Sequence, residues 1–226
     1  MSQSVLVLSL ALASGLVCAA LTACGTSRKT RRLRILWLCG SVAAIVLMVY
    51  ATAAIDLHFN FTPSMPLGIY RLAPLSNSGA RRGMLVAVCA PPVAAELGRL
   101  RGYLEAGRCP TAAEPLLKVV AAVAGDSVTV SASGVVVNGC LLRHSRALSR
   151  DAAGRWLYPW PHGHFQLRRG ELWLYAADDR SWDSRYWGPT PVEGVLARAL
   201  EVLVVPGAPL GEREAACPAR SDPHPP

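Results

Sequence analysis

The first quarter of the chain consists almost entirely of uncharged residues, interrupted by one short basic segment. Residues 1–27 contain no charged side chain, and neither do residues 35–55. About 20 consecutive apolar residues are enough for a helix to cross a bilayer. The pattern therefore predicts one or two N-terminal transmembrane helices, at about residues 4–24 and 35–55, in an anchor domain that spans residues 1–55.

After residue 55 the hydrophobic residues occur in short runs bounded by glycine, proline and polar residues. Residues 126–139 alternate valine with polar side chains around a Ser-Ala-Ser-Gly sequence, which predicts a β-hairpin. Only residues 91–110 have helical spacing. The sequence thus predicts a mainly β domain over residues 56–205, with a rolled antiparallel sheet, and a disordered Pro-rich tail over residues 206–226. The other predicted strands lie at residues 83–90, 115–125, 169–177 and 193–205.

The net charge of +8 comes mostly from the basic segment between the two uncharged runs. Residues 28–34 contain five arginine and lysine side chains, whereas the chain from Asp56 onward has 18 basic and 15 acidic residues. This distribution gives no reason to expect a nucleic-acid partner. Because basic residues beside a membrane helix favour the cytoplasm, residues 28–34 are predicted to form a cytoplasmic loop, with residues 56–205 outside the cytoplasm.

An alternative interpretation of the N-terminus is a lipoprotein signal at residues 21–25, which would place a lipid on Cys24. It fits less well, because the N-terminus lacks the basic region of a signal peptide.

Lys118 is the one lysine beyond the N-terminal quarter, since 21 of the 23 basic residues are arginines. It lies in the apolar run Leu-Leu-Lys-Val-Val, residues 116–120. A buried lysine can lose its proton, whereas arginine stays charged, and a neutral amine can act as general base for a serine hydroxyl. The alternative is a solvent-facing lysine on an edge strand, and the spacing alone leaves both interpretations open.

Ser64 lies in the sequence Thr-Pro-Ser-Met-Pro, residues 62–66. The two prolines restrict the backbone, and Ser64 keeps a backbone N–H that could donate to an oxyanion. The hydroxyl of Thr62 could donate to the same site. Such a turn fits a nucleophile held in a fixed position, but it also fits a rigid connection in which Ser64 has no chemical role.

A third polar segment, residues 178–189, places two tryptophans and a tyrosine among charged residues. Its Ser181 could hold a lysine amine by a hydrogen bond, and Asp183 and Arg185 could pair and fix the segment.

Two cysteines, Cys89 and Cys109, bracket the predicted helical segment. A location outside the cytoplasm permits disulfides, so these two are expected to pair. No spacing of cysteine and histidine predicts a metal site, and no cofactor is expected.

Taken in order, the serine, lysine and polar segments resemble the signal peptidase I superfamily, whose members use a Ser/Lys dyad. The residues around the serine resemble the N-x-T-x-S-M-P-x-G-x-Y pattern of the TraF-type peptidases of conjugative transfer systems. The resemblance covers roughly residues 56–205. In this chain the pattern is formed by Asn60, Thr62, Ser64, Met65, Pro66, Gly68 and Tyr70.

The resemblance implies a signal-peptidase-like fold and a role for each of these polar residues. Ser64 would be the nucleophile and Lys118 the general base, while the Ser64 N–H and the Thr62 hydroxyl would form the oxyanion hole. Ser181 would orient the lysine.

Asp183 and Arg185 match a structural pair close to the site in that family. The resemblance further implies a membrane-anchored serine endopeptidase of the bacterial inner membrane, with its catalytic domain on the periplasmic side. Its expected partners are the lipid bilayer, a conjugative secretion apparatus and a membrane-tethered, pilin-like precursor, which it would cleave and, as TraF-type enzymes can, cyclise. The alternatives are a general leader peptidase and a non-catalytic scaffold of the secretion channel.

Overall fold

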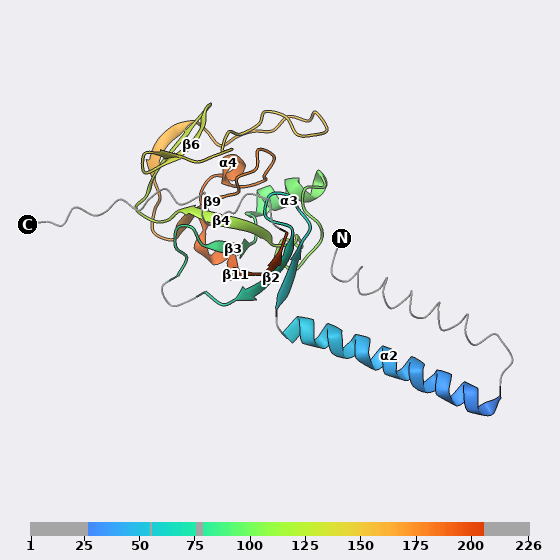
Figure 1. Ribbon diagram of the computed structural model, residues 1–226. Helices are drawn as coiled ribbons and strands as arrows, with labels where there is room; N and C mark the ends of the chain where they lie inside the picture. The colour runs from blue at the N-terminus through green and yellow to red at the C-terminus, as the bar shows by residue number, and fades with distance from the viewer. Residues whose placement is uncertain (1–26, 55, 76–78, 206–226) are drawn as a thin grey trace, which may run out of the picture. The chain divides into compact units, whose positions relative to one another are not determined.

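The structure, a computed structural model, describes residues 27–54, 56–75 and 79–205 (Figure 1). The chain divides into two compact units between Leu57 and His58. The predicted helix at residues 4–24 and the predicted tail at residues 206–226 lie outside the described residues, so both stay predictions.

The first unit contains the helix α2 (Arg28–Ala54). The helix begins within the basic segment, so residues 28–34 form its first turns, and the loop predicted there is wrong. Arginine and lysine are good helix formers, and this segment contains no glycine or proline to end a helix. Within the described part of the chain, no helix combines the length and apolar character needed to cross a membrane. The membrane span at residues 35–55 stays a prediction.

The second unit is mainly β, as the sequence predicts, and is built on a curled seven-stranded sheet (Figure 1). Its strands follow the order β1–β2–β11–β3–β4–β9–β10, and the pairs from β2 to β10 are antiparallel. The bounds are β1 (Leu57–Asn60), β2 (Gly68–Ala73), β3 (Leu85–Val88), β4 (Leu116–Ala122), β9 (Glu171–Tyr175), β10 (Thr190–Pro191) and β11 (Val195–Val204).

A second antiparallel sheet has four strands in the order β7–β6–β5–β8. The hairpin predicted at residues 126–139 is confirmed, because β5 and β6 pair in register from Val128 opposite Val137 to Ser131 opposite Gly134. The valines on one face of this hairpin are buried in the main core. The bounds are β5 (Ser127–Ser131), β6 (Gly134–Val137), β7 (Cys140–Leu141) and β8 (Gly163–Gln166).

Strand β4 runs through the interior of the large sheet, between β3 and β9 (Figure 1). Leu117 and Val119 point into the main core, while Val120 packs with a second apolar cluster on the other face of the strand. A strand covered on both faces is expected to be a continuous apolar run. Lys118 alternates with Leu117 and Val119 and therefore shares the face of Val120.

Helix α3 (Pro92–Leu100) is shorter than the helical segment predicted at residues 91–110. Gly102 adopts a left-handed conformation with φ of 73°, and the N–H groups of Tyr103 and Leu104 both return to the Gly98 carbonyl. This glycine turn ends the helix. The chain then folds back to Cys109, which forms a disulfide with Cys89. The remaining short helices are α4 (Ser184–Trp187) and a 3-10 turn at Val192–Gly194.

Candidate active site

The loop that carries Ser64 is held by the buried side chain of Asn60, at the end of β1. Its Nδ2 donates to the carbonyls of Thr62, Met65 and Pro66, each at 3.0 Å. Its Oδ1 accepts from the Thr62 N–H at 3.2 Å. Three carbonyls around one atom fit only the NH₂ end of the amide, which fixes its orientation. Asn60 therefore holds the backbone on both sides of Ser64.

Two further contacts fasten the end of this loop. The Tyr70 hydroxyl on β2 donates to the Pro66 carbonyl at 2.7 Å, and Met65 is buried in the main core. Ser64 itself is only partly buried. A rigid loop thus presents a serine that solvent or a substrate can reach.

The Thr62 hydroxyl also contacts Asn60, at 2.7 Å from Oδ1. A carboxamide oxygen can only accept, so Thr62 gives its one hydroxyl proton to Asn60. A donor role toward an oxyanion requires this hydroxyl to rotate away from Asn60. That role stays a prediction.

Lys118 is buried, with 1% of its surface exposed. The alternative of a solvent-facing lysine on an edge strand is therefore wrong. Its Nζ donates to Ser181 Oγ at 3.0 Å, the contact that the sequence predicts. Burial lowers the pKa of Lys118 to about 8, although the negative charge of Asp183 raises it in part. At physiological pH a fraction of the molecules thus holds a neutral amine at this position.

Asp183 and Arg185 form a fully buried ion pair next to this amine. The guanidinium contacts both carboxylate oxygens at 2.8 Å, through Nε and Nη2. Burial raises the pKa of Asp183, but the charge and hydrogen bonds of Arg185, together with the Lys118 charge and the Ser181 hydrogen bond, hold the pKa below its usual value. The pKa of Arg185 is raised, because Asp183 outweighs the opposing effect of burial.

The remaining donors of Arg185 hold two neighbouring loops. Nη1 donates to the His144 carbonyl at 2.8 Å, and Nη2 donates to the Asp178 carbonyl at 2.7 Å. A weaker contact of 3.3 Å reaches the carbonyl of Ser181. The pair therefore fixes the backbone that positions the partner of Lys118, which is the supporting role that the sequence predicts for it.

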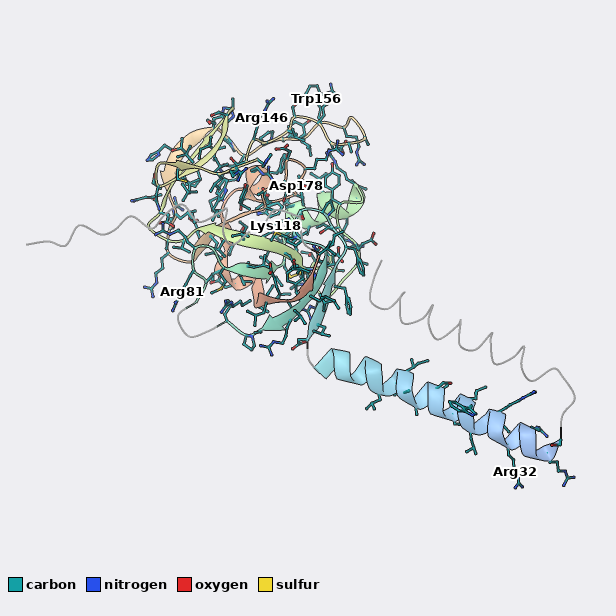
Figure 2. All side chains as sticks on the ribbon, in the orientation of Figure 1. Arg32, Arg81, Lys118, Arg146, Trp156 and Asp178 are labelled. Carbon is teal, nitrogen blue, oxygen red and sulfur yellow. A yellow bond between two sulfur atoms is a disulfide. The ribbon has the colours of Figure 1, made fainter. Side chains whose placement is uncertain are left out.

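A cleft of about 340 Å³ brings four of the predicted site residues together. Thr62, Ser64, Lys118 and Ser181 all line it, while Asp183 and Arg185 lie behind its wall. Figure 2 labels the buried Lys118 within the β unit and the exposed Trp156 at its outer edge. The other lining residues are Pro63, Tyr103, Leu116, Leu148, Arg150, Asp151, Ala152, Leu157, Asp178, Arg180, Trp182 and Tyr186.

One wall of the cleft is aromatic and depends on contacts that the sequence did not reveal. Trp182 stacks on Tyr186 with ring centroids 5.0 Å apart and contacts Tyr103 edge-on at 5.4 Å. The Trp182 indole N–H donates to the Ala94 carbonyl in α3 at 3.1 Å. The tryptophans of residues 178–189 were a signal of burial, but their partners near α3 are distant in the sequence.

At the rim of the cleft, hydrogen bonds between polar groups connect two segments of the chain, and we call this group the polar clasp. The Tyr103 hydroxyl donates to Asp151, whose carboxylate also accepts from Arg155 Nε at 2.6 Å. Arg101 donates to the Trp156 carbonyl at 2.8 Å. These bonds tie the end of α3 to residues 151–156, a loop that the sequence analysis left unassigned.

Within the described residues, no group of three or more His, Cys, Asp or Glu side chains is placed to hold a metal ion. The cleft lining itself contains a serine hydroxyl, a buried amine and hydrogen-bond donors around them.

The family model described as "Signal peptidase, peptidase S26" matches residues 29–204. The chain belongs to the signal peptidase family. Membership makes it a serine peptidase of the signal peptidase I type, and the mainly β, curled antiparallel sheet agrees with a signal-peptidase-like fold.

Relatives within this signal peptidase group come from several bacteria. The chain is 41% identical over 147 residues to "Probable conjugal transfer protein TraF" of Sinorhizobium fredii, covering 65% of this chain and 76% of that protein. It is 35% identical over 174 residues to "Conjugal transfer protein TraF" of Agrobacterium tumefaciens, covering 76% and 96%. It is 34% identical over 162 residues to "Plasmid transfer protein TraF" of Escherichia coli, covering 71% and 90%. The TraF-type resemblance is thus confirmed.

Proposed function

We propose that this signal peptidase uses Ser64 as nucleophile and Lys118 as general base to cleave exported precursor proteins of a conjugative transfer system. The observation that carries the proposal is one cleft lined by both Ser64 and a buried Lys118, with the Lys118 amine bonded to Ser181 at 3.0 Å. The names of the TraF relatives support the link to conjugation.

The proposed mechanism begins with proton transfer. Neutral Lys118 takes the proton of the Ser64 hydroxyl as Ser64 Oγ attacks the carbonyl carbon of the scissile peptide bond. Because one N–H of Lys118 is occupied by Ser181, the amine is oriented and its lone pair is kept for this proton. The protonated lysine then gives the proton to the leaving amine, and an acyl-enzyme remains on Ser64.

Release of the acyl group completes the proposed cycle. Lys118 activates a water molecule, whose attack frees the new carboxylate and restores Ser64. If the N-terminal amine of the same substrate attacks in place of water, the product is a cyclic chain that contains one water less. We propose that the substrate is a membrane-tethered, pilin-like precursor and that its maturation ends in this cyclisation.

Turnover also requires stabilisation of the oxyanion in each tetrahedral intermediate. In the proposed mechanism the Ser64 N–H donates to the oxyanion, and the Thr62 hydroxyl turns from Asn60 toward it. The Thr62 N–H remains bonded to Asn60 Oδ1, so the amide keeps a partner when the hydroxyl leaves.

We place the enzyme at the bacterial inner membrane, with the peptidase unit on the periplasmic side and the conjugative secretion apparatus as its neighbour. The support is the sequence, with its uncharged runs at residues 1–27 and 35–55 and the basic segment between them. Protease added to intact spheroplasts should degrade the β unit. Protection of that unit until the cells are lysed would overturn the proposed orientation.

The experiment that tests the function is intact-mass spectrometry of a pilin precursor encoded on the same mobile element. The precursor is co-expressed with this protein or with its Ser64→Ala variant. Shortening with the intact serine alone supports the proposal, and a product one water lighter than the linear fragment supports cyclisation. Equal shortening with both forms contradicts it. Cleavage of a general secretory reporter, with the pilin precursor left intact, would identify a general leader peptidase instead.

A further inference from the structure

We propose that Arg180 forms a carboxylate-binding subsite in the cleft and selects substrates that carry a negative charge close to the cut. The proposal rests on the proposed peptidase function and adds the chemistry of the group that the cleft recognises. It starts from the charged residues that line the cleft beside Ser64 and Lys118: Arg150, Asp151, Asp178 and Arg180.

Of the two acidic residues of the cleft, Asp151 is occupied by donors within the protein on both carboxylate oxygens, and Asp178 on one. The Asp151 carboxylate accepts from the Tyr103 hydroxyl, from the Nε and N–H of Arg155 and from the Ala153 N–H. Asp178 Oδ1 accepts from the Arg180 N–H at 2.7 Å. Asp151 is therefore not an open acceptor for a basic substrate residue, and its charge is offset by Arg155 outside the cleft lining. Asp178 keeps its second carboxylate oxygen available, so the proposal requires the free guanidinium of Arg180 to outweigh it.

The two basic side chains of the cleft keep hydrogen-bond donors that no group in the described part of the protein occupies. Arg150 is partly occupied: its Nη1 donates to the Gly154 carbonyl at 2.7 Å, and its guanidinium lies 3.7 Å from the centre of the Trp156 ring. Its other N–H groups remain as donors. Among the described residues, the exposed Arg180 side chain has no ion pair or hydrogen bond. A guanidinium carries five donors that match a carboxylate.

The backbone of Arg180 is rigidly held although its side chain is free. Asp178 Oδ1 accepts from the Arg180 N–H, and the Ser181 N–H donates to the Asp178 carbonyl at 3.1 Å. The buried Arg185 donates to the carbonyls of Asp178 and Ser181, on either side of Arg180. The base of the Arg180 side chain is thus fixed, which lowers the entropy cost of binding a ligand.

The position of Arg180 also limits where the substrate carboxylate lies. Arg180 directly precedes Ser181, whose hydroxyl is 3.0 Å from the Lys118 amine. An extended substrate advances about 3.3 Å per residue, so a carboxylate on Arg180 belongs within a few residues of the scissile bond. Two sources share this chemistry: an aspartate or glutamate side chain near the cut, and the free C-terminal carboxylate of a short chain segment beyond it.

The test uses the full-length protein in detergent and a library of eight-residue alanine-based peptides. One position at a time carries Glu, Gln or Lys, and each peptide is made with a free and an amidated C-terminus. Binding is measured by fluorescence polarisation to the Ser64→Ala protein, which does not need the chemical step. The same background carries Arg180→Gln, Arg180→Glu and the control Arg81→Gln, a surface position that does not line the cleft and lies at the edge of the unit in Figure 2.

The proposal predicts that Glu at one position, or the free C-terminus, binds about five- to tenfold more tightly than its neutral counterpart. Arg81→Gln should keep this ratio, Arg180→Gln should remove it, and Arg180→Glu should favour Lys. A preference for Glu over Gln identifies a side-chain carboxylate, and a preference for the free over the amidated end identifies a terminal one. An unchanged ratio in Arg180→Gln, or no carboxylate preference at any position, would overturn the proposal.

Cleavage of the same peptides by the protein with its serine intact reports separately on the peptidase function. Charge-selective binding that depends on Arg180, without cleavage, would contradict the dyad and leave the subsite standing. Cleavage without charge selection would support the dyad and overturn the subsite.

Discussion

At the scale of single residues, the chemistry depends on an amine that burial keeps partly neutral. Lys118 is the residue at which sequence and structure agree most directly, since an isolated lysine in an apolar run is found inside the sheet with 1% of its surface exposed. The aliphatic neighbours that make this lysine conspicuous also remove it from water and lower its pKa to about 8, with Asp183 limiting the decrease.

The pH dependence of cleavage follows from this pKa. Only neutral Lys118 can accept the Ser64 proton, and burial lowers its pKa to about 8. We therefore expect kcat/KM to rise with pH by about tenfold per unit below pH 8 and to level off above it. Initial rates on a cleavable peptide between pH 5.5 and 9.5 measure the profile. A rate that is flat across pH 6–9 would contradict a base with this pKa.

The same shift affects stability, with a definite sign. The pKa of lysine in the unfolded chain is near 10.5, while burial lowers the pKa of Lys118 in the fold to about 8. Between these two pH values the unfolded state binds more protons, so the free energy of unfolding rises with pH through that range. Below pH 8 the folded protein carries the full cost of burying the charged Lys118 amine. Lys118→Met should therefore stabilise the fold by about 3 kcal/mol at pH 7, and less near pH 10. Denaturant unfolding of both proteins at the two pH values checks this, and an equal difference at both would contradict it.

Asn60 is the residue whose importance the sequence revealed least, although it belongs to the recognised pattern. Asn60→Asp keeps an acceptor for Thr62 but places a carboxylate against the carbonyls of Met65 and Pro66. The Met65 carbonyl loses the Asn60 donor, and the Pro66 carbonyl keeps only the Tyr70 hydroxyl. We expect kcat to fall by about a hundredfold with KM nearly unchanged, because a shift of the nucleophile by about 1 Å has a cost of this order.

The matched control for Asn60 is Tyr70→Phe, which removes one donor from the Pro66 carbonyl but leaves that of Asn60. It should change kcat by less than about threefold. Steady-state kinetics, with thermal unfolding to verify that both variants fold, give the comparison. A full kcat in Asn60→Asp would exclude a positioning role.

At the scale of elements, valine-rich runs were predicted well because their pattern is local. Strands β3, β4, β5, β6, β9 and β11 all fall within the predicted segments. The predicted segments do not include β1 and β2, which flank Ser64, or the short strands β7, β8 and β10. Helix α3 was predicted too long, since its end depends on the left-handed Gly102.

The disulfide connects two of these elements. Cys89 follows β3 and Cys109 lies beyond α3, with a sequence separation of 20. A link that closes a loop of this length stabilises by roughly 3 kcal/mol in the chain-entropy picture. We expect the Cys89→Ala/Cys109→Ala double variant to lose about 2–4 kcal/mol of unfolding free energy.

Denaturant unfolding of the oxidised wild type and the double variant measures this loss. The single variant Cys39→Ala is the control, because Cys39 is an exposed free cysteine in α2. A double variant as stable as the wild type would show that α3 is held by its packing alone.

At the scale of the whole β unit, the predicted residues of the cleft come from three separate stretches of chain. Thr62 and Ser64 come from the loop after β1, Lys118 from the interior strand β4, and Ser181 from the segment before α4. Their types and order could be predicted from the sequence, because each stands out from its neighbours. The aromatic wall and the clasp at Asp151 could not, since both depend on pairings between segments far apart in the chain.

The central claim is that Lys118 serves Ser64 as a base, and its most direct test is the cleavage rate of Lys118→Arg beside Lys118→Met. Arginine keeps the charge but cannot release a proton, and methionine keeps much of the shape without the amine. Both variants should lose activity by about a hundred- to ten-thousandfold while thermal unfolding confirms that they fold. Wild-type cleavage by either folded variant would contradict the dyad.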